Sequence, residues 1–188
     1  GNDFAAVGRL PPARLDEIDT MAQAVGRWLH AHDYVGAFGI DVLVEPDRVR
    51  LTEVNARFQG SSLVGAQIAR ACEIPDLYLD HLACFLGITV SNGPSVADWV
   101  RMQEPRSQIV CHNTTEGHLE YRPSRGDRQP LPRDVALDLA PPPQTLIDPG
   151  AAAFRIHMSD SCTDDGASIS PAAQRVVQQL EQRLTPLR

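Results

Sequence analysis

The sequence has no lysine: all 17 basic residues are arginines, set against 24 acidic residues for a net charge of −7. A negative balance argues against nucleic-acid binding through bulk charge. No apolar run approaches the roughly 18 residues that a membrane-spanning helix needs, and no basic-then-apolar signal segment opens the sequence. We therefore expect a cytoplasmic protein whose partners are neither nucleic acid nor membrane.

Cysteine is also scarce, with 4 residues that lie far apart and form no CxxC pair. This spacing indicates reduced, buried thiols rather than disulfides. The histidines near them match no zinc-binding spacing. The absence of lysine, together with 15 prolines in an alanine-rich sequence, fits the coding bias of a high-GC bacterium.

What is present suits one domain, or a domain and a small companion, since 43% of the residues are hydrophobic. Periodicity and turn signals predict helices and strands in alternation. In the first half we expect helices over 14–32, 62–72 and 76–86, with strands over 37–44 and 49–55. In the second half we expect strands over 108–112, 119–122, 135–139 and 151–158, a helix over 171–184, and loops through most of 122–149.

The composition changes near residues 88–95, which predicts one part over residues 1–90 and another over residues 91–188. With the helices and strands predicted above, we expect the α+β fold class, an antiparallel sheet flanked by helices with a small α+β extension.

Two apolar helix faces are expected to pack in the core. They are Leu15, Ile18, Met21, Ala22, Val25, Trp28 and Leu29, and then Leu77, Leu79, Leu82, Phe85 and Leu86, the second set having a homodimer face as its alternative.

The predicted hairpin over 36–55 carries the first chemical signal. With its turn centred on Asp47, Asp41 lies opposite Glu53, Leu43 opposite Leu51, and Gly39 opposite Asn55. Because side chains alternate along a strand, Asp41, Glu53 and Asn55 share one face. Two carboxylates directly opposite each other repel, so something must compensate for them.

A divalent cation would compensate most simply. Asp41 and Glu53 carboxylates and the Asn55 amide oxygen are the hard ligands that Mg²⁺ takes while it leaves positions for phosphate oxygens. Arg57 follows closely, and its planar guanidinium suits a phosphoryl group or an oxyanion. The alternative interpretation is a solvated strand face with no ligand.

The segment Gln59, Gly60, Ser61 and Ser62 lies between the hairpin and the next predicted helix. One serine is expected to cap that helix. Backbone amides at a helix N-terminus also bind anions, so the same segment is a candidate for holding a carboxylate.

These residues resemble the ATP-grasp carboxylate–amine ligases. That family has a helix, then Gly-x-x-Gly-Ile-Asp, a turn, and an apolar strand with Glu-x-Asn-x-Arg. Here the matching residues are Gly36, Gly39, Ile40, Asp41, Glu53, Asn55 and Arg57, and the resemblance covers about residues 1–90. It implies the C-terminal lobe of an ATP-grasp domain.

The resemblance assigns roles to the candidate residues. It implies that Asp41, Glu53 and Asn55 hold Mg²⁺, or Mn²⁺, against the phosphates of ATP. Arg57 would be the catalytic residue that stabilises the acyl phosphate and the tetrahedral species formed by amine attack. Gln59, Gly60, Ser61 and Ser62 would bind the substrate carboxylate. The implied enzyme is an ADP-forming ligase that joins a carboxylate to an amine, with peptide-like substrates.

The sequence also departs from this family, which grips ATP with lysines on an earlier subdomain. With no lysine and no glycine-rich loop before residue 36, this chain is expected to work with N-terminal ATP-grasp subdomains that precede it. Residues 91–188 would then form a lid or a substrate-specificity subdomain. Two alternatives stay open: a non-catalytic scaffold derived from ATP-grasp, and a biotin carboxylase-like enzyme that uses carboxyphosphate, although no Glu-His pair follows Arg57.

Overall fold

The computed structural model describes residues 1–123 and 131–187. The chain forms two compact units, Val7–Glu104 and a second unit made of Gly1–Ala6 with Pro105–Arg188. Residues 91–104 thus lie in the same unit as residues 7–90, and α4 (Val96–Met102) packs there against α1 (Pro12–His30), whereas residues 1–6 belong to the second unit. The roles predicted for the two parts of the chain stay predictions.

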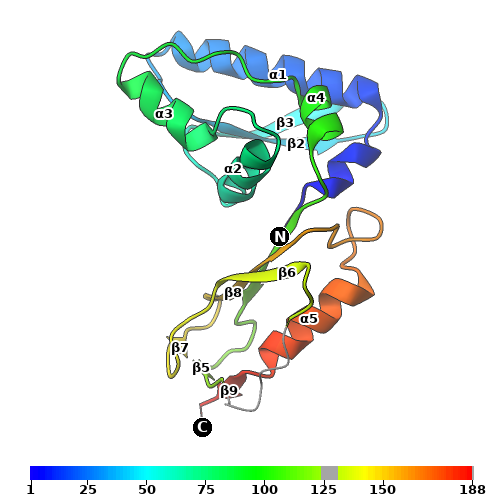
Figure 1. The fold of residues 1–188 in the computed structure, drawn as a ribbon, viewed down its shortest axis with the longest axis vertical. Helices are drawn as coiled ribbons and strands as arrows, with labels where there is room; N and C mark the ends of the chain where they lie inside the picture. The colour runs from blue at the N-terminus through cyan, green and yellow to red at the C-terminus, as the bar shows by residue number, and fades with distance from the viewer. Residues whose placement is uncertain (124–130, 188) are drawn as a thin grey trace. The chain divides into compact units, whose positions relative to one another are not determined.

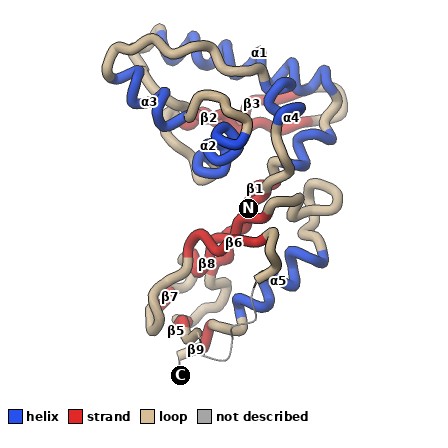
Figure 2. Tube along the Cα trace, viewed as in Figure 1, coloured by secondary structure: helices blue, strands red, loops and turns tan. Residues whose placement is uncertain are grey.

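The first unit contains one hairpin and most of the helices (Figure 1). Its strands are β2 (Gly39–Val44) and β3 (Val49–Asn55), and α1 packs against both. The helices α2 (Ser62–Ala71) and α3 (Leu77–Phe85) follow and pack against each other. The loop after α3 then runs back to α1 (Figure 2), where the N–H of Val96 donates to Asp19 at 3.2 Å.

The predicted apolar faces of this unit are only partly confirmed. Leu15, Val25 and Leu29 of α1 are buried, but Trp28 is 57% exposed and stacks on His32 instead of packing inside. The core prediction for α3 is wrong, since no residue of this helix is buried. Leu77 at its start is half-buried, whereas most of its other large apolar side chains are exposed. The exposed ones are Leu79, Leu82, Phe85 and Leu86.

The second unit is built on antiparallel sheets, which confirms the α+β class. The larger sheet has the order β1-β4-β8-β6 and the smaller one the order β7-β5-β9. The bounds are β1 (Asn2–Asp3), β4 (Ser107–His112), β5 (Leu119–Tyr121), β6 (Val135–Leu139), β7 (Leu146–Ile147), β8 (Ala152–Met158) and β9 (Leu184–Pro186). Residues 124–130 of the predicted loop region lie outside the described residues.

The helix α5 (Pro171–Glu181) buries one face in the core of this unit. Ala173, Val176 and Leu180 pack with Phe154 and Ile156 of β8, and all of these five except Val176 are fully buried. The helix begins at the cap Ser170, whose Oγ accepts from the N–H of Ala173 at 3.2 Å. It ends at Glu181 rather than Leu184, because residues 184–186 form a strand beside β5.

All four cysteines are free, and the predicted burial is confirmed for Cys111 and Cys162 but not for Cys72 and Cys84, which are half-buried. Burial raises the pKa of the Cys111 thiol to about 11, and Glu181 adds to the effect. Burial also raises the pKa of Cys162. In the described part of the chain, no helix combines the length and the apolar character needed to cross a membrane.

Candidate functional site

The hairpin sets the geometry of the candidate site. Asp41 pairs with Glu53, and Gly39 pairs with Asn55, as the sequence predicted. The predicted pairing of Leu43 with Leu51 is wrong: Leu51 lies opposite Val42. The chain turns within Glu45–Arg48, closed by the N–H of Glu45 donating to the carbonyl of Arg48 at 2.9 Å.

A β-bulge explains why the pairing of Asp41 with Glu53 was predicted correctly and that of Leu43 with Leu51 was not. The register shifts between Asp41 and Val42, so that Thr52 is an extra residue on β3. Its hydroxyl donates to the carbonyl of Asp41 at 2.8 Å. A bulge re-aims the side chains beside it, and here it is what brings Glu53 opposite Asp41.

The two carboxylates lie opposite each other on the surface of the hairpin. Both Asp41 and Glu53 are exposed, and within residues 1–123 and 131–187 neither forms an ion pair. The hairpin's arginines Arg48 and Arg50 instead pair with Glu45 at the turn. Because facing like charges destabilise a strand pair, a bound cation would stabilise this face.

Asn55 lies beside Asp41 in the candidate site. Its side chain is only 7% exposed. Its Nδ2 donates a long hydrogen bond to Asp41 Oδ2 at 3.5 Å, which turns the amide toward the carboxylate. The carboxylates of Asp41 and Glu53 and the amide oxygen of Asn55 thus lie on neighbouring strand positions of one face.

Gln59 enters the site from the loop after β3. Its Nε2 donates to Asp41 Oδ1 at 3.0 Å. The side chain reaches there by crossing Gly39, where an added Cβ would overlap the Oε1 and Cδ atoms of Gln59. The sequence placed Gln59 with the substrate-binding loop and gave no signal of this contact.

Ser61 and Ser62 begin α2 without capping it in the expected way. Ser61 occupies the cap position, but its side chain makes no capping hydrogen bond. The Oγ of Ser62 accepts from the backbone N–H of Gln59 at 2.9 Å, and the Ser62 N–H donates back to the Gln59 carbonyl at 3.0 Å. The predicted side-chain cap is therefore replaced by a closed loop of residues 59–62 that includes Gly60.

Arg57 is exposed and lies on the same loop. Its backbone N–H donates to the Asn55 carbonyl at 2.8 Å, and its Nη1 donates to the carbonyl of Phe58 at 3.1 Å. The guanidinium therefore has further donors that are not used by these bonds. The structure places Arg57 beside the site without joining it to either carboxylate.

An aromatic cluster that the sequence did not reveal anchors this region. Phe58 stacks on Tyr78 and His81, with ring centroids 4.6 Å apart in both cases. His81 Nδ1 also accepts from the N–H of Ala37 at 2.9 Å. Gly36, at φ 119°, leaves room for this ring, because a Cβ there would lie 2.5 Å from Nδ1. The cluster thus ties α3 to the segments on both sides of the hairpin.

The donor set fits a hard cation that shares its ligands with water and phosphate. Mg²⁺ usually binds through one or two carboxylates plus phosphate oxygens, and Asp41 and Glu53 supply two. In the described residues no group of three or more His, Cys, Asp or Glu side chains forms a complete protein cage. The hairpin thus offers part of a cation's coordination shell and leaves positions for water or phosphate oxygens.

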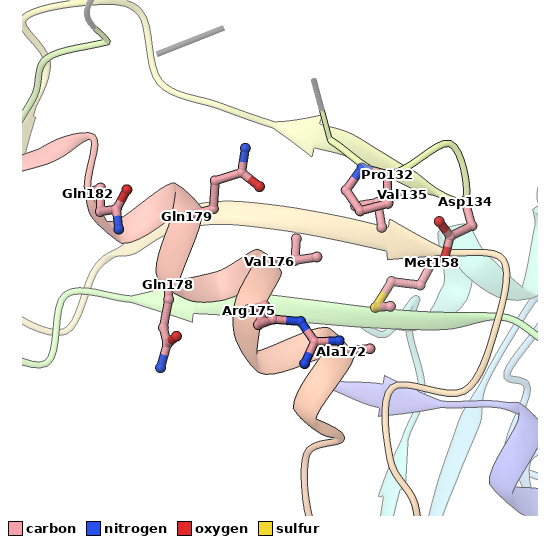
Figure 3. Close-up of a pocket in the computed structure, with 10 residues that line it drawn as sticks. All are labelled: Pro132, Asp134, Val135, Met158, Ala172, Arg175, Val176, Gln178, Gln179 and Gln182. Atoms are coloured by element: carbon pink, nitrogen blue, oxygen red, sulfur yellow. The ribbon is translucent and has the colours of Figure 1, made fainter. Parts of the chain in front are cut away.

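A cavity in the second unit is a weaker candidate for the functional site. In the second unit, about 580 Å³ lies between α5 and the strands, bordered by Arg175, Gln178, Met158 and Asp134 among others. Its polar side chains do not converge on one point, and Gln178 points away from the strands (Figure 3). The hairpin remains the stronger candidate.

Comparisons with known proteins agree with the fold. No family model matches this chain, and no curated protein matches it. Solved structures do match, and the likeness concerns the fold, which is consistent with the C-terminal part of an ATP-grasp domain, as the motif indicated.

The matching structures include two N5-carboxyaminoimidazole ribonucleotide synthetases. The one from Thermus thermophilus has a TM-score of 0.50 at 15% identity, over 89% of this chain and 39% of its own. The one from Thermotoga maritima has a TM-score of 0.49 at 11% identity, over 89% of this chain and 42% of its own. This chain thus spans about two fifths of the structures it matches.

Proposed function

We propose that this chain is the cation-binding part of an ATP-dependent ligase, which joins a carboxylate to an amine through an acyl phosphate and forms ADP. The observation that carries the proposal is the bulged register that sets Asp41 against Glu53 with Asn55 beside them. Facing carboxylates repel each other, so they need a use that offsets this cost to a two-stranded sheet. In an ATP-grasp fold they have a chemical one.

The residues divide the work by their chemistry. Asp41, Glu53 and Asn55 would hold Mg²⁺, or Mn²⁺, which supplies positive charge against the phosphates of ATP. Arg57 would stabilise the negative charge that develops when the amine attacks the acyl phosphate. Gly60, Ser61 and Ser62 would receive the substrate carboxylate at the N-terminus of α2.

Further parts of the enzyme are needed around this chain. It has no lysine to grip the nucleotide, so we infer that N-terminal ATP-grasp subdomains supply that clamp. The residues beyond 90 would act as a lid or select the substrate. The exposed face of α3, which includes Leu82 and Leu86, is the candidate homodimer surface. Free thiols fit a cytoplasmic enzyme.

The test is ADP formation by the complete polypeptide that carries these residues, measured with pools of amino acids as acid and amine. We expect turnover to need both substrates and Mg²⁺. Asp41→Asn should lower kcat/KM by on the order of 10²-fold or more, as for a removed charge-stabilising group. Asp47→Asn makes the same change at the exposed turn of the same hairpin and should have little effect. ADP formation unaffected by Asp41→Asn would refute the proposal.

A second candidate is a ligase that uses carboxyphosphate. The matching solved structures are named for a carboxylated amine product, although identities of 11% and 15% carry only the fold. Bicarbonate in place of the carboxylic acid tests this candidate in the same assay. A scaffold role would instead give no turnover with any acid and no cation binding at the hairpin.

A further inference from the structure

Asp41 is the best-held of the candidate cation ligands. Its Oδ1 accepts from Gln59 Nε2 at 3.0 Å, and its Oδ2 accepts from Asn55 Nδ2 at 3.5 Å. Each carboxylate oxygen has two acceptor positions. The amides therefore fix the orientation of the carboxylate and still leave acceptor positions for a cation.

The approach of Gln59 depends on the absence of a side chain at Gly39. This glycine lies within β2, opposite Asn55, where glycine weakens a strand and often marks a close approach. A Cβ there would also lie 2.9 Å from Nε2 of Gln59, the atom that binds Asp41. No positive φ explains the glycine, since Gly39 is not among the residues with that conformation.

The backbone of Gln59 is also held in place. Its N–H donates to Ser62 Oγ at 2.9 Å, and its carbonyl accepts from the Ser62 N–H at 3.0 Å. A side chain that starts from a closed loop and ends on a carboxylate has little freedom left. The Asp41 side chain is then already ordered in the folded chain, so cation binding need not supply the conformational entropy of fixing it.

We propose that Gln59 is a positioning residue that holds the Asp41 carboxylate in place for a divalent cation, and that Gly39 is present to admit it. This inference rests on the proposed function, because it assumes that Asp41 binds the cation. Partners behind a metal ligand typically change metal affinity by about 10- to 100-fold when removed. If the hydrogen bond from Gln59 to Asp41 only closed the loop, its removal would lower stability and leave the cation affinity unchanged.

The experiment titrates Mn²⁺ into this chain and follows free Mn²⁺ by electron paramagnetic resonance. Gln59→Ala should weaken binding about tenfold, the low end of that range because the site is exposed. Gly39→Ala should weaken it in the same direction by displacing Gln59. The double variant should bind no more weakly than Gln59→Ala, since both changes remove one contact. The size-matched Gln59→Leu provides a second variant if Gln59→Ala unfolds.

Gln23→Ala is the matched control, because Gln23 Nε2 also donates to an aspartate, Asp19 Oδ2 at 2.7 Å, on α1. It should leave the affinity unchanged. If Asp41→Asn weakens Mn²⁺ binding and the Gln59 variants do not, the positioning role is overturned and the proposed function stands. If Asp41→Asn also binds like the wild type, the cation is not at the hairpin and both fail. Additive losses in the double variant would overturn the role given to Gly39.

Discussion

Arg57 has an exposed guanidinium that is bonded only to the neighbouring carbonyl of Phe58 among its described contacts. If it meets charge that exists only in the transition state, Arg57→Lys in the complete enzyme should lower kcat more than it raises KM. The lysine keeps the charge but loses the planar fork, and we expect a loss of about 10²-fold. Steady-state kinetics with both substrates measure it. A near-normal kcat would make Arg57 a residue of the loop structure.

Asp3 joins the N-terminal strand of the second unit to the loop after β8. Its carboxylate accepts from Ser161 Oγ at 2.6 Å and from the Thr163 N–H at 3.1 Å. Partial burial raises the pKa of Asp3, but these hydrogen bonds together bring it below its ordinary value of 3.8. A pKa lowered by folding stabilises the protein above the unfolded value, and this contribution is lost as the pH falls through the folded value.

Asp3→Asn should therefore lower the free energy of unfolding at pH 7 by about 1–2 kcal/mol. It should also reduce the loss of stability as the pH falls below the ordinary aspartate pKa of 3.8. Urea unfolding at a series of pH values measures both effects. The exposed Asp16 of α1 gives the control Asp16→Asn. An acid profile identical to that of the wild type would remove Asp3 from the account.

At the scale of single elements, two serines at helix starts differ in what they bond. Ser170 Oγ accepts from the Ala173 N–H at the start of α5, whereas Ser61 makes no side-chain cap at the start of α2. Ser170→Ala should cost about 1 kcal/mol of stability, and Ser61→Ala far less. Urea unfolding followed by circular dichroism compares them. Equal losses for the two variants would contradict the difference in capping.

The elements that could be predicted from the sequence are those that rest on local patterns. The hairpin and α5 followed from period-two alternation and from the cap-and-proline start of Ser170-Pro171. The missed strands β1, β7 and β9 are 2, 2 and 3 residues long, and distant partners define them. Asn2 pairs with Gln108 and Leu184 with Tyr121, which no local pattern records.

The candidate site was predictable to a similar degree. Alternation and the turn indicated that Asp41 and Glu53 face each other, and the structure has that pairing. The contact of Gln59 with Asp41, and that of His81 with Ala37, join residues 18 and 44 positions apart. Such contacts depend on tertiary packing, although Gly39 and Gly36 mark where the backbone leaves room for them.

At the scale of the whole chain, the negative net charge is expected to weaken the binding of Mg-ATP to these residues alone. The net charge is −7 and lysine is absent, so nothing but arginine opposes the negative charge of ATP. We expect Mg-ATP to bind with a dissociation constant weaker than about 1 mM, worth about −4 kcal/mol. The complete polypeptide should bind far more tightly, because a clamp that closes over the nucleotide excludes water.

Isothermal titration of this chain and of the complete polypeptide checks that expectation. Micromolar binding by these 188 residues alone would show that the nucleotide site has been misplaced. Arginines of this chain would then take the part assigned to the missing lysines. Candidates are Arg9, Arg14, Arg101 and Arg106.

The Asp41–Glu53 face of the hairpin is the proposed binding site for a divalent cation. Nuclear magnetic resonance of this chain with small additions of Mn²⁺ tests it most directly, because bound Mn²⁺ broadens the signals of nearby nuclei. Broadening should begin at residues 39–42 and 53–55 and should be lost in Asp41→Asn. Broadening that begins instead at the acidic loop of Asp160, Asp164 and Asp165, or that spreads evenly over the chain, would contradict it.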